Sequence, residues 1–266
     1  MPNQTTALLN TIDDEKAALD AARPLPPHTV ASLREKLLLE WTYHSNAIEG
    51  NTLTLRETKV VLEGITVGGK SLREHFEATN HRDAIVYVED IVSKAEALSE
   101  WQIRNIHRLV LNSIDNEEAG RYRRENVVIA GASTTPPEFL HLPAEMGSLI
   151  SWYESSGSMH SVERAAELHT RFVKIHPFVD GNGRTGRLLL NFELMKAGYP
   201  PAIIRKEDRL AYYDALDKAC VSGAYDDITR LVANSVHRSL DTYLDVLGLR
   251  RTPAPDATPP SPGFRM

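Results

Sequence analysis

Apolar residues recur at helical spacing along most of the chain, and this pattern predicts a mainly helical protein. The clearest case lies between residues 29 and 50, where Gly50 follows the last apolar position as a stop signal. Thr29 or Ser32 is expected to cap the start of this helix. Its apolar positions are Leu33, Leu37, Leu38, Trp41 and Ile48.

Two successive helices are predicted in the second half of the chain. The first begins at Ser161 and has to end before Pro177, because the residue before a proline disfavours helical backbone. The second begins around Gly183 or Arg184, and a Gly-Tyr-Pro-Pro turn ends it. Two further helix starts carry the capping-box pattern, in which a hydroxyl and a carboxylate three residues apart bond each other's backbone N–H groups. They are Thr54 with Glu57 and Ser71 with Glu74.

One short segment favours a strand. Val127, Val128 and Ile129 are β-favouring, and the glycine and prolines that follow supply turn chemistry, so we expect a small hairpin there. Strands do not alternate with helices elsewhere. The predicted fold class is therefore mainly α, with a short β-hairpin.

A phosphate-loop pattern occurs at residues 64–71, but its surroundings argue against that function. The sequence Gly-Ile-Thr-Val-Gly-Gly-Lys-Ser satisfies G-x-x-x-x-G-K-[ST], which binds nucleotides when a buried strand precedes it. Residues 57–63 instead carry three charges and follow a capping box, which is typical of a helix. We therefore interpret residues 64–71 as a glycine-rich link between two helices.

Composition narrows the class of protein. The 266 residues, 42% hydrophobic and 25% charged, fit an ordinary globular chain of one large or two small domains. A net charge of −6 provides no overall charge pattern for binding nucleic acid. The single Cys220 cannot form an internal disulfide, and the N-terminus resembles no secretory signal, so we expect a cytoplasmic protein. No run approaches the roughly 18 apolar residues of a membrane span.

The chain is expected to divide into three parts. Residues 1–28 would form an N-terminal helix and linker, and residues 29–249 a single main domain. Residues 250–266 are rich in proline and cannot bury a core, so we predict a disordered tail.

The segment His-Pro-Phe-Val-Asp-Gly-Asn-Gly-Arg-Thr-Gly-Arg, at residues 176–187, concentrates chemically useful groups. Gly181 and Gly183 allow backbone N–H groups to face an anion where the following helix begins. Arg184 and Arg187 are three residues apart, so they share a helix face and match phosphate oxygens with paired hydrogen bonds. This combination indicates a polyphosphate site.

His176 and Asp180 add groups that a transfer reaction needs. An imidazole with an ordinary pKa of about 6.5 can accept a proton at neutral pH and activate a hydroxyl. A carboxylate beside phosphates is a ligand that magnesium prefers, so a metal–nucleotide substrate is predicted. The same segment also fits a plain turn between helices, with Asp180 and Asn182 as caps. An EF-hand is not favoured, because the downstream acidic ligands are missing.

The complete string HPFVDGNGRTGR resembles the Fic family signature H-x-F-x-[DE]-G-N-G-R-x-x-R at every specified position. The resemblance runs from about Leu33 to Val246 and covers most of the chain. It implies a Fic-type helical bundle, with the hairpin at residues 128–132 as a flap that aligns a target segment by main-chain pairing. It also implies transfer of AMP from ATP, with Mg²⁺, to a Ser, Thr or Tyr hydroxyl of a target protein.

The resemblance implies roles for individual residues. His176 would be the general base and Asp180 the magnesium ligand. Tyr212 and Tyr213 match a pair near the adenosine, with aromatic packing on a helix as the alternative. Cys220 stands where some relatives carry an amide, which leaves base selectivity open. The expected nucleotide-binding set is Asp180, Gly181, Asn182, Gly183, Arg184, Thr185, Gly186, Arg187, Ile129, Ala130, Gly131, Tyr212 and Tyr213.

Residues 45–50, Ser-Asn-Ala-Ile-Glu-Gly, resemble the inhibitory motif [ST]-x-x-x-E-[GN] of some Fic proteins. In that interpretation residues 29–50 form an inhibitory helix, and Glu49 pairs with Arg187 in place of the γ-phosphate. Ser45, one turn earlier, would fix the carboxylate or the helix end, and a simple exposed serine explains it equally well. We expect the isolated protein to be largely inactive.

These features together predict a self-inhibited protein adenylyltransferase. The alternatives are another nucleotidyl or phosphoryl transfer, removal of AMP at the same site, or a non-catalytic helical module that only holds nucleotide. His176 argues against the module, because phosphate binding alone needs no base. ATP, Mg²⁺ and a target protein with a modifiable hydroxyl are the expected partners. Self-modification and a homodimer are both compatible with the hypothesis of an adenylyltransferase. No nucleic acid partner and no membrane span are expected.

Overall fold

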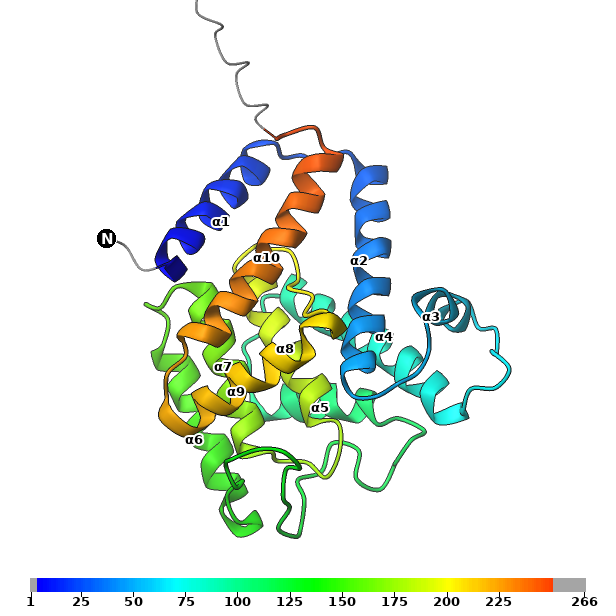
Figure 1. Ribbon diagram of the computed structural model, residues 1–266, viewed down its shortest axis with the longest axis vertical. Coiled ribbons are helices and arrows are strands. Elements are labelled where there is room, and N and C mark those ends of the chain that lie inside the picture. Colours follow the sequence, from blue (N-terminus) through cyan, green and yellow to red (C-terminus); the bar gives the residue numbers. More distant parts are fainter. Residues whose placement is uncertain (1–3, 251–266) are drawn as a thin grey trace, which may run out of the picture.

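The computed structural model describes residues 4–250, which fold into helices joined by loops (Figure 1). No β-strand occurs in this part of the chain. The helices are α1 (Gln4–Ala21), α2 (Pro27–Ile48), α3 (Leu55–Leu62), α4 (Leu72–Ser93), α5 (Glu100–Val110), α6 (Leu142–Ser155), α7 (Ser161–Ile175), α8 (Asn182–Lys196), α9 (Arg209–Ser222) and α10 (Asp226–Val246), with short 3₁₀ turns η1 (Phe139–His141) and η2 (Lys206–Asp208).

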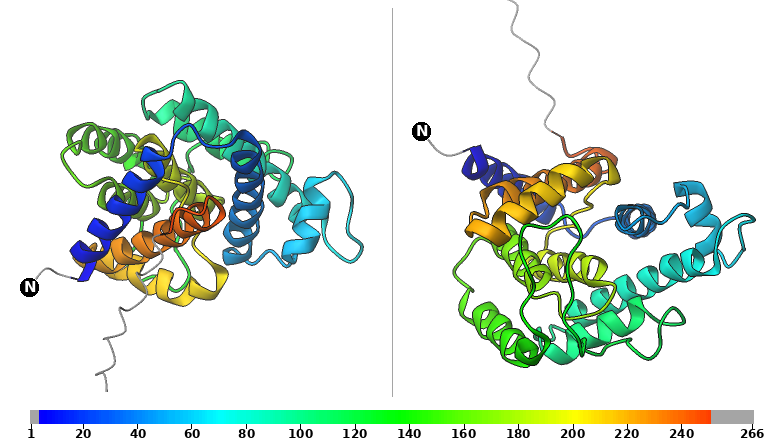
Figure 2. Two further views of the ribbon diagram at one scale, coloured as in Figure 1. Left: turned by 90° about the horizontal axis from the view of Figure 1, so that it is seen from above. Right: turned by 60° about the horizontal axis from the view of Figure 1, so that its bottom comes forward.

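Helix α8 is the central element of the fold (Figures 1 and 2). Every residue from Arg184 to Leu194 is buried, as expected for a helix that packs on all sides. Leu189 and Phe192 join the hydrophobic cluster formed with α4 to α7. Leu190 and Leu194 join a second cluster that includes α1, α9 and α10. Both halves of the core therefore meet on α8.

Helices α7 and α8 approach closely because a glycine lies between them. A Cβ atom at Gly186 would lie 2.8 Å from His169 Nδ1 and 3.1 Å from Val173 Cγ2, too close for any larger residue without movement. Since α7 ends at Ile175 and α8 begins at Asn182, this tight pair also holds both ends of the loop 176–181.

Both predicted capping boxes are present. Thr54 with Glu57 starts α3, and Ser71 with Glu74 starts α4, with both reciprocal hydrogen bonds made in each case. Helix α3 lies directly before residues 64–71, so the interpretation of that segment as a link between helices is confirmed. Lys70, the lysine of the phosphate-loop pattern, donates to the Thr52 carbonyl at 2.6 Å.

The predicted cap of α2 was wrong. The helix begins at Pro27, two residues before Thr29, and no side chain caps it. A proline at the first helical position has its φ already set for the helix and has no N–H that needs a partner, so a polar cap is dispensable.

The predicted hairpin at residues 127–132 was also wrong, because this segment is an irregular loop. The ends of the loop are tied by side chains and not by a backbone ladder. Arg123 donates to the carbonyls of Glu125 and Pro137, and the Ser133 N–H donates to Asp217 at 2.7 Å. A strand needs a partner backbone, and the described chain brings none beside this segment.

The predicted tail and the predicted division of the chain are not tested by the described residues. The predicted tail falls outside the described residues from position 251 onward, and the division at residues 28 and 29 stays a prediction. None of the described helices is long and apolar enough to cross a membrane.

Candidate active site

Hydrogen bonds from Arg123 and Asn182 hold the loop between α7 and α8. His176 ends α7 with left-handed backbone, at φ +50°. The side chain of the buried Arg123 donates from Nε to the His176 carbonyl at 3.0 Å. The backbone N–H of Arg123 donates to the Pro177 carbonyl at 2.9 Å. The amide of Asn182 accepts the Phe178 N–H at 3.0 Å and donates to the Phe178 carbonyl at 2.8 Å. These bonds fix the backbone of His176 relative to the start of α8.

His107 of α5 also holds this loop. Its ring stacks on Phe178, with ring centroids 3.6 Å apart. Nδ1 accepts the Gly120 N–H at 2.9 Å, which leaves Nε2–H to donate to the Asp180 carbonyl at 2.9 Å. Burial lowers the pKa of His107 to about 4, so the ring stays neutral. His107 therefore positions Asp180.

The N-terminus of α8 faces a carboxylate. A Cβ atom at Gly183 would lie 2.2 Å from Glu49 Oε1, so the carboxylate lies directly over the first turn of α8. Free N–H groups at a helix start attract anions. Glu49, the C-cap residue directly after α2, thus occupies a position suited to a phosphate.

Arg187 binds the same carboxylate. Its Nη2 donates to Glu49 Oε1 at 2.7 Å and to the Ser45 carbonyl at 2.8 Å, and its Nε donates to Ser45 Oγ at 3.0 Å. Only 4% of the Arg187 side chain is exposed, against 34% for Glu49. Burial alone would lower the pKa of Arg187, but Glu49 raises it above its ordinary value. The expected contact of Glu49 with Arg187 is present, and Ser45 is a buried partner of the arginine.

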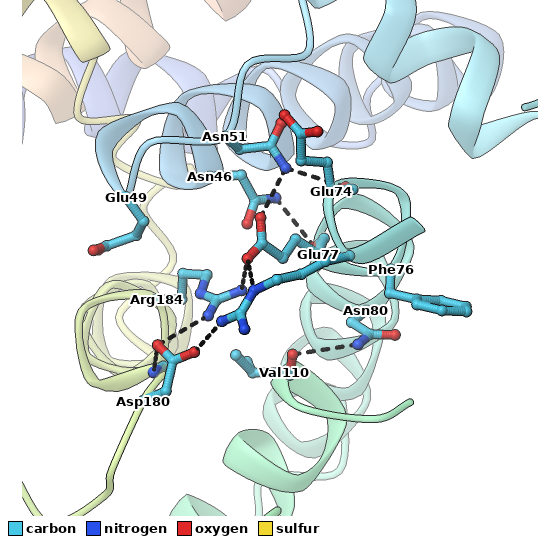
Figure 3. Close-up of polar contacts among 12 residues, drawn as sticks. Asn46, Glu49, Asn51, Glu74, Phe76, Glu77, Asn80, Val110, Asp180 and Arg184 are labelled. Carbon is cyan, nitrogen blue, oxygen red and sulfur yellow. Dashed lines mark hydrogen bonds and ion pairs between the residues drawn. The ribbon is translucent and has the colours of Figure 1, made fainter. Parts of the chain in front are cut away.

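Asp180 gathers positive groups at the rim of the site (Figure 3). Its Oδ1 accepts the Gly181 N–H at 2.6 Å and lies 3.4 Å from Arg184 Nη2, while Oδ2 pairs with Arg73 at 2.5 Å. Arg184 Nη1 also lies 3.7 Å from Glu77 Oε1. Burial alone would raise the pKa of Asp180, but Arg184, the Gly181 N–H and Arg73 lower it, so the carboxylate is ionised at neutral pH.

A cavity of about 380 Å³ brings the predicted base and part of the predicted nucleotide site together. Burial lowers the pKa of His176 below its ordinary value of 6.5, although the Val173 carbonyl opposes the shift. Of the sequence-predicted residues, the cavity is lined by Glu49, Ile129, Ala130, Gly131, His176, Gly183, Arg187, Tyr212 and Tyr213, with Cys220 beside them.

Other predicted nucleotide contacts do not line this cavity. Asn182 uses its side-chain amide to hold Phe178, Thr185 is fully buried, and Gly186 packs against His169. Asp180, Gly181 and Arg184 belong to the rim network and not to the cavity wall.

The two tyrosines differ in their surroundings. Tyr212 is buried, and its hydroxyl lies 2.7 Å from His169 Nε2 and 3.4 Å from Arg187 Nη1. Tyr213 is 38% exposed and donates to the Ile48 carbonyl at 3.3 Å. Tyr212 thus supports Arg187, and Tyr213 is the member with a surface accessible to a ligand.

Sequence reasoning gave no role to Arg73, Glu77, His107 or Arg123. The one available signal was the spacing of Arg73 and Glu77, which predicts an ion pair on one helix face. The contact of Arg73 with Asp180 joins positions 107 residues apart, and no local pattern reports it.

Comparison with known proteins places this arrangement in a family. The model of the Fic/DOC family matches residues 97–194, which include the whole 176–187 segment. A Fic-domain-containing signalling protein of Bacteroides thetaiotaomicron is 31% identical, and its structure aligns with a TM-score of 0.82 over 92% of this chain and 100% of that one. The chain belongs to the Fic/DOC family. Fic-1 of C. elegans, residues 134–508, is 32% identical, with a TM-score of 0.84 over 92% of this chain and 73% of that one.

Curated members of the Fic/DOC family are also similar in sequence. Protein adenylyltransferase Fic of Nematostella vectensis is 39% identical over 243 residues, which is 89% of this chain and 56% of that protein. The protein of the same name in Drosophila willistoni is 38% identical over 91% of this chain and 50% of its own length. The chain therefore spans about half the length of the curated relatives it matches.

Asp180 fits a divalent metal in this Fic/DOC site. The carboxylate is ionised, 44% of its side chain is exposed, and it lies beside the start of α8, where anions are favoured. A hard oxygen ligand next to bound phosphates is the environment that Mg²⁺ prefers.

Proposed function

We propose that this Fic/DOC chain is a self-inhibited protein adenylyltransferase, which transfers AMP from ATP to a hydroxyl of a target protein. The observation that carries the proposal is the cavity shared by His176, Arg187 and the N-terminus of α8, in which Glu49 holds the anion position. The names of the similar curated proteins support the same activity.

In the proposed reaction the target's hydroxyl oxygen forms a bond to the α-phosphorus of ATP, and the bond from that phosphorus to pyrophosphate breaks. His176 accepts the hydroxyl proton, because burial keeps its imidazole neutral at pH 7. Arg187 and the first N–H groups of α8 hold phosphate oxygens. Asp180 would hold Mg²⁺, which neutralises phosphate charge.

Glu49 acts as the brake in this proposal. Its ion pair with Arg187 is largely buried, with 4% of the arginine side chain and 34% of the glutamate side chain exposed. The carboxylate of Glu49 matters because it occupies space and hydrogen-bond donors that a γ-phosphate would need, over Gly183 and on Arg187. Ser45 holds Arg187 in the inhibited geometry.

The loop of residues 126–137 is the proposed flap, in spite of its lack of strands. Ile129, Ala130 and Gly131 line the cavity, and the bond of the Ser133 N–H to Asp217 ties the loop to α9. The main chain of a target can pair with backbone groups of such a loop and so present its hydroxyl to the cavity.

The test is removal of the brake. Glu49→Gly should raise transfer from α-labelled ATP, because it frees Arg187 and the start of α8 for the γ-phosphate. Intact-protein mass spectrometry would detect the added AMP on the chain itself or on a supplied target. No transfer from any nucleoside triphosphate by this variant would reject the proposed function.

Glu63→Gly is a matched control. Glu63 is the C-cap residue of α3 as Glu49 is of α2, with nearly identical backbone angles and a positive-φ glycine after it. Because Glu63 does not line the cavity, its replacement should leave transfer at the low starting level. If Glu49→Gly gives no gain while Arg187→Ala in that background abolishes transfer, Arg187 keeps its proposed role. The proposed inhibitory role of Glu49 is then wrong.

Removal of AMP is the second candidate. Glu49 and His176 line the same cavity, so the carboxylate could orient a water molecule toward a phosphorus bonded to a target hydroxyl. Water would then supply the new P–O bond, and the target oxygen would leave with a proton. An AMP-modified protein incubated with the unaltered chain distinguishes this reaction, because release of AMP would be lost in Glu49→Gly.

A further inference from the structure

Arg73 contacts the carboxylate that the proposed reaction needs for its metal. It lies in the first turn of α4, and its Nη2 pairs with Asp180 Oδ2 at 2.5 Å. The side chain is 57% exposed, so the guanidinium approaches Asp180 from the solvent side. The other oxygen, Oδ1, already accepts the Gly181 N–H. Both carboxylate oxygens therefore carry a donor in this state.

Glu77 holds Arg73 in this position through an ion pair on α4. Glu77 lies one turn after Arg73 on α4. Its Oε1 accepts from Arg73 Nε at 3.2 Å and lies 3.7 Å from Arg184 Nη1. Its Oε2 accepts from Asn51 Nδ2 at 2.9 Å, just beyond the end of α2. Only 13% of the Glu77 side chain is exposed, so this anchor is more fixed than the arginine that it holds.

We propose that Arg73 is a displaceable cation that occupies Asp180 in the resting protein and competes there with the divalent metal. The inference rests on the proposed function, because it takes Asp180 as the metal ligand. Mg²⁺ binds carboxylate oxygens at about 2.0–2.1 Å, much closer than a guanidinium hydrogen bond, and the two cations repel each other. Binding of the metal therefore weakens the contact of Arg73 with Asp180, and the contact of Arg73 weakens binding of the metal.

The exposure of Arg73 sets the size of the effect. Partly exposed ion pairs shift equilibria by small factors, so the competition should lower metal affinity by about 2- to 5-fold. The effect should shrink at high salt, because solvent-exposed charges are screened. A purely structural role for Arg73 would not follow ionic strength in this way.

The experiment measures binding and not turnover. In the Glu49→Gly background, with His176→Ala added because AMPPNP keeps the α–β bond that the proposed reaction breaks, isothermal titration calorimetry would compare the parent with Arg73→Ala, using AMPPNP with Mn²⁺ and, separately, with EDTA. Arg73→Ala should bind Mn²⁺–AMPPNP about 2- to 5-fold more tightly and metal-free AMPPNP no more tightly. Weaker binding of both forms would mean that Arg73 clamps phosphate, and would overturn the proposal.

Two controls isolate the contact. Arg82→Ala removes the same charge from α4, about 14 Å along the helix and on its opposite face, and should change neither affinity. Adding Asp180→Asn should abolish the effect of Arg73→Ala, since the two residues would then no longer be coupled. If Arg73→Ala still tightens Mn²⁺–AMPPNP by the same factor, the gain is a general charge effect and the proposal is wrong.

A measurement of Mn²⁺ binding without nucleotide distinguishes failure of this inference from failure of the proposed function. If Glu49→Gly binds no AMPPNP in either form, the nucleotide site has failed. Electron paramagnetic resonance of free Mn²⁺ would then compare the otherwise unaltered chain with Arg73→Ala. Tighter Mn²⁺ binding by Arg73→Ala, lost with Asp180→Asn, supports the competition, and equal binding overturns it.

Discussion

At the scale of the residue, the proposed chemistry depends on an imidazole that burial keeps neutral. The pKa of His176 lies below 6.5, so the base is available above that value and is lost only as the pH falls through the lowered pKa. Glu49 raises the pKa of His176, so its removal moves the midpoint further in the acid direction. The left-handed backbone of His176, fixed by Arg123, places the ring at the cavity.

The resulting prediction concerns the pH–rate profile of Glu49→Gly. Single-turnover transfer should be constant near neutral pH and should fall in acid with a midpoint below about 6.5. His176→Ala in this background should lose about two to four decades of rate, and its remaining rate should not show this fall in acid. An acid midpoint clearly above 6.5 would show that another group controls the rate.

At the scale of the element, a capping carboxylate links α4 to the segment after α2. Glu74 Oε1 accepts the Thr52 N–H at 2.9 Å, and Oε2 accepts the Ser71 N–H at 2.9 Å. These bonds, with the Thr52 hydroxyl first among them, lower the pKa of Glu74 from 4.5 to about 2. The stabilisation is therefore present above about pH 4.5 and disappears as the pH falls toward 2.

Glu74→Gln should lower the free energy of unfolding by about 1 kcal/mol at pH 7, because glutamine keeps only one of the two acceptor oxygens and carries no charge. Urea unfolding at several pH values would measure it. The difference between variant and parent should narrow below pH 4.5, because the parent's carboxylate is then progressively protonated. A difference that stays constant down to pH 2 would contradict the assigned charge.

At the scale of the whole molecule, α1 is part of the hydrophobic core. It packs along α10 (Figure 1), and its Leu9, Ile12 and Leu19 are buried in the second cluster. That cluster meets the first one on α8, so the two halves should unfold together in a single transition.

Ile12→Ala should therefore lower the free energy of unfolding by about 2–5 kcal/mol, because Ile12 has no exposed surface and leaves a cavity. Chemical denaturation followed by circular dichroism would measure it, with the exposed neighbour Thr11→Ala as the control. A loss as small as that of the control would show that α1 contributes little to the core.

The sequence alone was sufficient for features whose causes lie within a few residues. The capping boxes at Thr54 and Ser71 could be predicted because both partners of each box are three positions apart. The helical class and the loop 176–181 between two helices follow from spacing and from proline and glycine positions in the same way. The pairing of Glu49 with Arg187 came from resemblance to other Fic sequences and not from local spacing.

The tertiary structure decided what depends on distant partners. Val127 to Ile129 have strand-forming side chains, but no backbone within residues 4–250 pairs with them as a strand, so the segment remains a loop. Ser45 is buried against Arg187, 142 positions away, and Asp180 meets Arg73 only after α4 packs beside α8. Hydrophobic periodicity reports which face of a helix is buried and not which helix covers it. The sequence thus determined the elements and the reactive loop, and helix packing determined which charges surround that loop.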